Sequence, residues 1–434
     1  MSILKNILNF LLLVSFVQFA NGQKTTWSLQ DCIDAGLENN IGIKIQKLEV
    51  KRTQKSRVSM VNELLPTVSL FGSQSYNFGS TIDPSTNGRV SSNIQYDNFY
   101  FNAQMNLLDF GAIAASQKSK IGVEFAKAEQ EIIENEYKLQ ILESFYQALF
   151  TQELVEIQKQ QLVNTHFNLS RITKEVEIGS KPKSDLYDIQ FAFAQEEKLL
   201  METQQLFETQ KLQLFQLMNV EEVSWNSVKL ENKVANAAIN FDTLSNPKIK
   251  GAALSLENSR KEVRFQRAKN LPVLSSFYQL SSFYYKPLNN SAFSVDNFSN
   301  QIGNNKTQQL GLQLVIPIFN GFKNNKTIIS AQIETQKSKL KLEQEQLKIE
   351  QQLKVEYMNQ ANYVVVEHKL IEVLEYAKAS FSTTQSKFAS GITDVFLFSI
   401  AKNNLLKSEY DLLKNQLQNQ YTSYKINLIR SNRL

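Results

Sequence analysis

The residues that most often carry out catalysis or bind metals are scarce in this chain. It has one cysteine, Cys32, and two histidines, His166 and His368, among 434 residues. A single cysteine excludes a disulfide framework and a thiolate metal cluster, and each histidine falls in a long helical pattern with no second histidine or cysteine three or four positions away. No P-loop, G-x-S-x-G, H-E-x-x-H or C-x-x-C motif is present. We therefore expect no enzyme activity, no catalytic residues, no cofactor and no metal site.

The composition predicts a chain dominated by long helices. Only 14 Gly and 7 Pro are present, which is about 3% and 2% against a usual roughly 7% and 5%. So few helix breakers argue against a sandwich, a propeller or an α/β enzyme. The net charge of +5 comes without a basic block, so nucleic acid is not an expected partner. The mean hydropathy of −0.30 excludes a bundle of membrane-spanning helices and, by itself, suggests a soluble rod.

The first 22 residues have the pattern of a secretory signal peptide. Lys5 precedes a short apolar stretch over residues 7–19, and Ala20-Asn21-Gly22 places small residues at a cleavage site. The alternative is a buried N-terminal helix, but the polar run that follows at once favours cleavage. We expect residues 1–22 to be removed and the mature, exported chain to begin near Gln23.

The remainder of the chain is an internal duplication. Four residues of the first half recur in the same order in the second: Asn40, Leu48, Leu65 and Pro66 match Asn246, Leu254, Leu271 and Pro272. For each half the sequence predicts the same order of features: helix, proline, two strands, glycine, long helix, tight turn and helix. We expect two structural repeats, residues 23–235 and 236–434.

The predicted strands alternate apolar and polar residues. Residues 99–109 and 309–318 do so with period two, which is typical of a strand with one buried face. Their polar positions include Asn102, Gln104, Asn106 and Gln313. Residues 67–78 and 273–285 are the expected partner strands, and residues 79–98 and 286–306 are expected to be long exposed loops.

Strands of about ten residues with one apolar face fit the wall of a transmembrane barrel. A small sheet packed on the helices is the soluble alternative. A sheet in a bilayer cannot leave open edges, and four strands are fewer than the roughly eight that the smallest single-chain barrels need. A barrel would therefore have to be assembled from several chains.

The glycine of each half is followed by a segment almost free of breakers, residues 112–178 and 322–390. As one helix, each would be roughly 100 Å long. Helices of this length are stable when packed laterally, as in coiled coils. A fibrous coiled-coil scaffold explains these helices but leaves the strand hairpins unexplained.

The duplicated order, with Pro66 and Pro272 before strands and Gly111 and Gly321 before long helices, resembles the TolC-like outer membrane efflux family. The resemblance implies a mainly α fold with β: a long α-helical coiled-coil barrel plus a transmembrane β-barrel, assembled from three chains with four strands each. It also implies a homotrimer in the outer membrane, in contact with its lipid, whose helices lie in the periplasm. The implied partners are a periplasmic adaptor and an inner-membrane pump of the RND or ABC type.

The implied function is the exit duct of a tripartite efflux system. The exit duct of a type I (ABC) protein secretion system is the alternative, together with the scaffold that has no pore. The resemblance further implies that Asn102, Gln104, Asn106 and Gln313 line the barrel.

The resemblance also assigns the two tight turns to the periplasmic tip. In such proteins, aspartates after the second turn form rings at the constriction. Asp394 occupies the first such position, whereas the second is Leu397. Phe388 stands where a tyrosine often holds the closed state, and the turn is too short for the gating arginine of the family. Asp185 is the equivalent aspartate of the first turn.

The same turns allow a simpler interpretation. Ser184, Thr393 and Asp394 can each cap the helix that follows. For Ser184 and Thr393 we expect the cap. For Asp394 the cap and the ring both remain open.

Overall fold

The computed structural model describes residues 26–82, 87–91, 93–220, 228–232, 245–288 and 295–433. The expected signal peptide lies outside these residues, as does the expected boundary between the repeats near residue 235. The chain forms two compact units. The first comprises residues 1–48, 128–250 and 344–434, and the second comprises residues 49–127 and 251–343. Each unit therefore contains segments of both sequence repeats.

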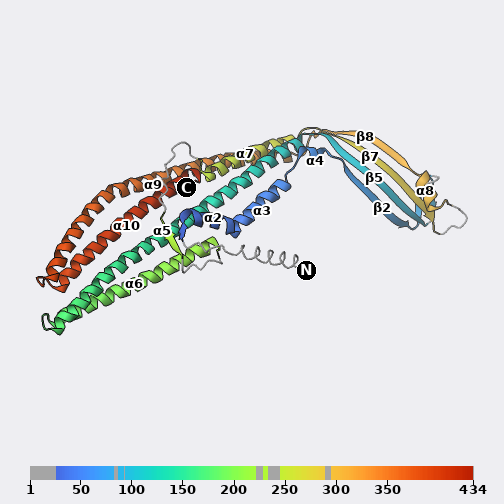
Figure 1. Ribbon diagram of the computed structural model, residues 1–434. Coiled ribbons are helices and arrows are strands. Elements are labelled where there is room, and N and C mark those ends of the chain that lie inside the picture. Colours follow the sequence, from blue (N-terminus) through green and yellow to red (C-terminus); the bar gives the residue numbers. More distant parts are fainter. Residues whose placement is uncertain are drawn as a thin grey trace, which may run out of the picture. The chain divides into compact units, whose positions relative to one another are not determined.

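Long helices dominate the chain, and the two longest were predicted almost to the residue. They are α5 (Phe110–Glu177) and α9 (Lys323–Ala389). Each is followed by a tight turn and a second helix, α6 (Lys183–Met218) and α10 (Val395–Ser431), so that two helical hairpins lie side by side in the first unit (Figure 1). The remaining helices before the sheet strands are α2 (Leu29–Asn39), α3 (Ile41–Lys55), α4 (Met60–Leu64) and α7 (Pro247–Ala268). None of the described helices is long and apolar enough to cross a membrane.

An apolar core holds the first unit together. Leu142 and Phe145 of α5 are almost fully buried against Phe215 of α6 and Leu428 of α10. Cys32 of α2 is fully buried in the same cluster. A short parallel pair, β1 (Thr26–Ser28) with β6 (Lys229–Glu231), joins the N-terminal segment to the region after α6. Because α5, α6 and α10 bury apolar residues in one cluster, the two hairpins pack as one bundle.

The second unit is built on a four-stranded antiparallel sheet in the order β2-β5-β7-β8. Its strands are β2 (Thr67–Asn77), β5 (Ile94–Asp109), β7 (Val273–Pro287) and β8 (Thr307–Val315). All four predicted strands are confirmed. The last one ends three residues earlier than expected, ahead of Pro317, which has no N–H to donate to a ladder. The central β5–β7 pair joins the two sequence repeats.

The two expected loops are partly wrong, because both contain secondary structure. The first contains the small hairpin of β3 (Ser80–Ile82) and β4 (Arg89–Ser91), and also the first residues of β5. The second contains α8 (Phe298–Asn304). From α8 the side chain of Gln301 accepts a hydrogen bond from the Tyr285 N–H and donates one to the Tyr285 carbonyl. This helix therefore occupies the edge of β7 beyond the end of β8.

Candidate functional site

The two hairpin turns of the first unit share one backbone design. Gly179 and Gly391 adopt left-handed φ values of 76° and 72° at the ends of α5 and α9. Each turn closes with a 6→1 and a 5→2 hydrogen bond, as between Ile392 and Lys387 (2.8 Å) and between Gly391 and Phe388 (3.2 Å). This is the Schellman motif, in which glycine adopts the left-handed conformation without steric cost. The paired glycines therefore account for the sharp reversal at both tips.

Phe388 lies in an apolar cluster that joins the two tips. Its side chain is fully buried, and its ring stacks on that of Phe398 with 4.5 Å between centroids. Ile172 of α5 and Ile189 of α6 belong to the same buried cluster. Phe388 is therefore a packing residue between the hairpins rather than a residue exposed at an opening.

Arg171 of α5 binds the end of α9 from the other hairpin. Its Nη1 donates to the carbonyls of Ala389 (3.1 Å) and Phe388 (3.4 Å). Its guanidinium carbon also lies 4.7 Å from the centre of the Phe388 ring, and Lys181 Nζ lies 5.0 Å from the same centre. Two cations thus lie against one aromatic ring at the negative end of a helix dipole. From the sequence, an arginine was considered only in the second turn. Arg171, which belongs to α5 of the first repeat, was not identified.

Asp394 is the N-cap of α10. Its Oδ1 accepts a hydrogen bond from the Leu397 N–H at 2.8 Å, and the residue is exposed. Leu397 is 51% exposed. Asp185 lies within the first turn of α6 and pairs with Lys181 at 3.4 Å. The capping interpretation of Asp394 is thus confirmed in geometry, while a ring at a constriction stays a prediction.

The expected caps at Ser184 and Thr393 are wrong. Pro182 is the N-cap of α6, so Ser184 already lies inside the helix. Thr393 precedes the cap, because Asp394 takes that position. Proline suits the position ahead of the helix because its φ is fixed and it has no N–H to satisfy.

A buried lysine links the hairpins further from the tips. Lys402 of α10 is only 3% exposed, and its Nζ lies 2.7 Å from both carboxylate oxygens of Glu196 on α6 and 3.0 Å from the Gln161 carbonyl of α5. It also donates to the hydroxyl of Thr165. Burial lowers the pKa of Lys402, and the neighbouring Glu196 carboxylate partly opposes that shift. The ion pair satisfies both charges within the bundle.

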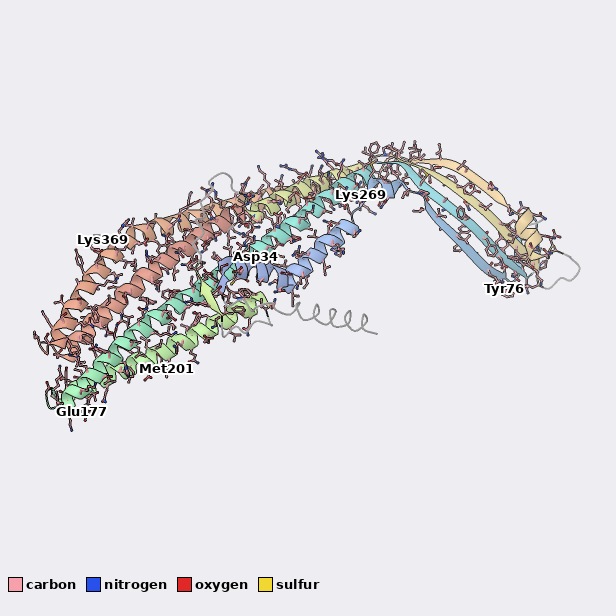
Figure 2. The ribbon with its side chains drawn as sticks, viewed as in Figure 1. Asp34, Tyr76, Glu177, Met201, Lys269 and Lys369 are labelled. Atoms are coloured by element: carbon pink, nitrogen blue, oxygen red, sulfur yellow. The ribbon has the colours of Figure 1, made fainter. Side chains whose placement is uncertain are left out.

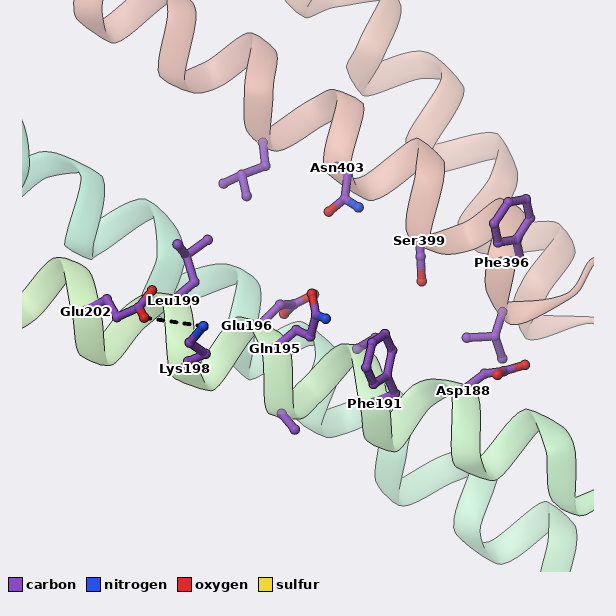
Figure 3. A pocket seen from close by; sticks show the side chains of 14 residues that line it. Asp188, Phe191, Gln195, Glu196, Lys198, Leu199, Glu202, Phe396, Ser399 and Asn403 are labelled. Atoms are coloured by element: carbon purple, nitrogen blue, oxygen red, sulfur yellow. Dashed lines mark ion pairs between the residues drawn. The ribbon is translucent and has the colours of Figure 1, made fainter.

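A groove of about 760 Å³ lies between α6 and α10 beside this ion pair (Figure 3). Phe191 of α6 and Phe396 of α10 both line it, 66% and 68% exposed. Carboxylates on its α6 side include Asp188 and Glu202, the latter paired with Lys198 at 3.4 Å. No group of three His, Cys, Asp or Glu side chains able to hold a metal occurs in the described part of the chain.

The sheet of the second unit has two chemically different faces. Directly paired residues project from the same face of a sheet, and the register pairs Asn102 with Gln279, Gln104 with Phe277, and both Asn106 and Gln313 with Ser275. The four predicted lining residues therefore share one polar face. The opposite face is apolar over its middle rows, which include Leu70, Phe101 and Leu280, then Ala103, Tyr278 and Leu310.

A sequence profile described as outer membrane efflux protein matches residues 243–430. No curated protein sequence matches the chain.

Solved structures share the fold over almost its whole length. CusC, described as forming a transmembrane channel, is 15% identical, with 95% of this chain and 96% of that one covered at a TM-score of 0.75. The outer membrane protein VceC of Vibrio cholerae is 13% identical, with 92% and 94% covered at 0.73. The outer membrane channel CmeC of Campylobacter jejuni is 14% identical, with 93% and 84% covered at 0.74. At such identities the likeness concerns the fold, which is the one that the resemblance implied.

Proposed function

Residues 243–430 belong to the outer membrane efflux protein family, and from this premise we propose that the chain is the outer-membrane exit duct of a tripartite efflux system. In this function it receives substrates from an inner-membrane pump and a periplasmic adaptor and lets them pass passively across the outer membrane. The chain is then a conduit and performs no chemical step.

The observation that carries this proposal is the amphipathic sheet with two free edges. Within the described chain, β2 pairs only with β5 and β8 pairs only with β7. Leu70 on β2 and Leu310 on β8 are 79% and 77% exposed on the apolar face. That face suits lipid, and in lipid every strand edge must be paired. The edges of β2 and β8 are then completed by other copies of the chain.

The helices of the first unit also support assembly with other molecules. Large apolar side chains stand exposed along them, including Phe167 (71%), Met201 (62%) and Tyr376 (67%); Met201 is labelled in Figure 2. Exposed apolar residues in this number indicate protein contacts. We assign them to a homotrimer, the assembly that the resemblance implies, and to the adaptor.

The tip residues take defined roles in such a trimer. Three copies of Asp394 bring three exposed carboxylates together as a ring that favours cations, with Leu397 as an apolar constriction beside it. The Arg171–Phe388 contact holds the two hairpins of each copy together in the closed state. Opening then requires the tip helices to move apart, driven by the adaptor.

The two alternatives differ from this function in testable ways. Purified protein reconstituted in planar bilayers is expected to form channels, and chemical crosslinking is expected to give trimers. A coiled-coil scaffold without a pore would form no channels in planar bilayers. Co-purification from native membranes distinguishes an RND pump with its adaptor from the ABC exporter of a type I secretion system.

A further inference from the structure

The polar face of the sheet carries no charge over most of its length. From the row of Asn106, Ser275 and Gln313 to the row of Ser75, Tyr96 and Tyr285, the described strand residues on this face are Ser, Thr, Asn, Gln, Gly, Phe and Tyr. Of the charged residues in these strands, Asp97 and Lys286 fall on the opposite face, in the rows of Tyr284 and Gln95. Asp109 ends β5 opposite Val273, just beyond the Asn106 row, and accepts a hydrogen bond from the Asn106 amide at 3.2 Å. Between these two rows the strands place no carboxylate or ammonium group on the polar face, so this stretch offers no electrostatic preference to a passing ion.

Aromatic rings stand among these amides and hydroxyls. Phe71 and Tyr100 are direct cross-strand partners and stack with 4.6 Å between centroids at an interplanar angle of 22°. Phe283 in the next row and Tyr96 in the row after it form a second, diagonal pair, with 5.6 Å between ring centroids at 29°. The face therefore carries two stacked aromatic pairs along its length, flanked by polar rows.

Phe277 adds a further ring, which is held close to the backbone of β8. A Cβ atom at Gly311, its direct partner, would lie 2.6 Å from the Phe277 ring. Only glycine leaves room for this ring to lie across the neighbouring strand. The aromatic character of the polar face thus extends from β2 to β8.

On the basis of the proposed function, we infer that this face lines the passage and binds neutral saccharides as they move through it. Sugar rings present apolar C–H faces that pack on aromatic rings and hydroxyl groups that both donate and accept hydrogen bonds. The amides of Asn102 and Gln104 match those hydroxyls, because each amide offers donors and an acceptor. An ionic solute finds no opposite charge in the strand rows between Asn106 and Tyr96. A purely apolar solute would strip water from the amides without replacing their hydrogen bonds.

The first experiment measures the block of ion current by maltohexaose, a neutral glucan, with the full-length protein in planar bilayers. The sugar is added to each compartment in turn. We expect a concentration-dependent block, weakened at least tenfold in Tyr100→Ala and in Phe71→Ala. The matched control is Phe101→Leu, which changes a ring on the apolar face and should leave the block unchanged. Channels that maltohexaose does not block, or blocks equally in Tyr100→Ala, would overturn the saccharide site.

The second experiment tests the neutrality of the face independently of sugar. Asn102→Asp and Asn102→Lys add one charge of either sign per copy at the same position. We expect the ratio of cation to anion permeability to rise in the first variant and to fall in the second. If channels form but this ratio does not respond to either change, the face does not line the passage. Absence of channels in the unmodified protein would instead refute the proposed function.

Discussion

The guanidinium of Arg171 lies 4.7 Å from the centre of the Phe388 ring and donates hydrogen bonds to the last carbonyls of α9. These two residues come from different sequence repeats and different hairpins. Their contact joins the two hairpins near their turns. The Phe388 ring is held by this cation and by the stacked Phe398 ring, and neither contact requires a hydroxyl group.

Removing this arginine should loosen the tip. Arg171→Met keeps the apolar stem but removes the donors and the charge, so the hairpins lose three interactions with α9. We expect a larger mean conductance in planar bilayers and a loss of stability of about 1.5–3 kcal/mol, typical of hydrogen bonds that involve a charged group.

The matched control for Arg171→Met is Lys174→Met. Lys174 is an exposed cation on the same helix, so the charge change is equal but no contact with α9 is lost. Equal conductance in the two variants would show that the Arg171 contact does not hold the tip closed.

Two substitutions at Asp394 separate its capping role from its charge. Asparagine caps helices as well as aspartate, so Asp394→Asn should retain stability but reduce cation selectivity of the channel. Asp394→Ala should reduce selectivity equally and also cost about 1 kcal/mol through loss of the bond to the Leu397 N–H. The measurements are reversal potentials in a salt gradient and thermal unfolding. Unchanged reversal potentials in both variants would leave Asp394 as a cap alone.

The ion pair of Lys402 and Glu196 should stabilise the packing of the two hairpins. Glu196→Ala leaves a buried ammonium group with only neutral partners, which typically costs about 3 kcal/mol or more. Glu202 lies on the same helix and forms a solvent-exposed ion pair with Lys198. Glu202→Ala breaks that pair and should cost less than about 1 kcal/mol, because exposed ion pairs contribute little to stability. Thermal unfolding followed by helical circular dichroism compares the two. A similar loss in both variants would contradict the structural importance of the buried pair.

The same lysine predicts a dependence of stability on pH. Because burial lowers the pKa of Lys402, the folded chain binds fewer protons than the unfolded chain between that lowered pKa and the ordinary value of 10.5. Stability must then rise with pH through this interval. Lys402→Met removes the titrating group. The difference in unfolding free energy between the unmodified protein and this variant should therefore change with pH only between the lowered pKa of Lys402 and 10.5. A difference that is constant with pH would contradict the lowered pKa.

The order of elements could be predicted because it depends on local signals. Pro66 and Pro272 directly precede β2 and β7, and Gly391 ends α9 with its positive φ. The helix α8 was not predicted, because it is positioned by a tertiary contact. Gln301 binds the backbone of Tyr285 at the edge of β7, and no local sequence signal indicates this contact. Arg171 was missed for the same reason, since its partner Phe388 lies far along the chain. Repeats and periodicity predict elements, whereas cross-hairpin contacts depend on packing that a single sequence does not encode locally.

The two faces of β8 make the sharpest test of whether the sheet meets lipid. Leu310 is 77% exposed on the apolar face, so in water a lysine there would cost almost nothing. In a bilayer the same change costs about 2–4 kcal/mol per copy at the midplane, and Leu310→Lys should reduce the yield of heat-resistant trimers. Gln309→Lys, one residue earlier and on the polar face, should assemble normally. If both variants assembled equally well, the apolar face would not be facing lipid, and the sheet would belong to a soluble assembly instead.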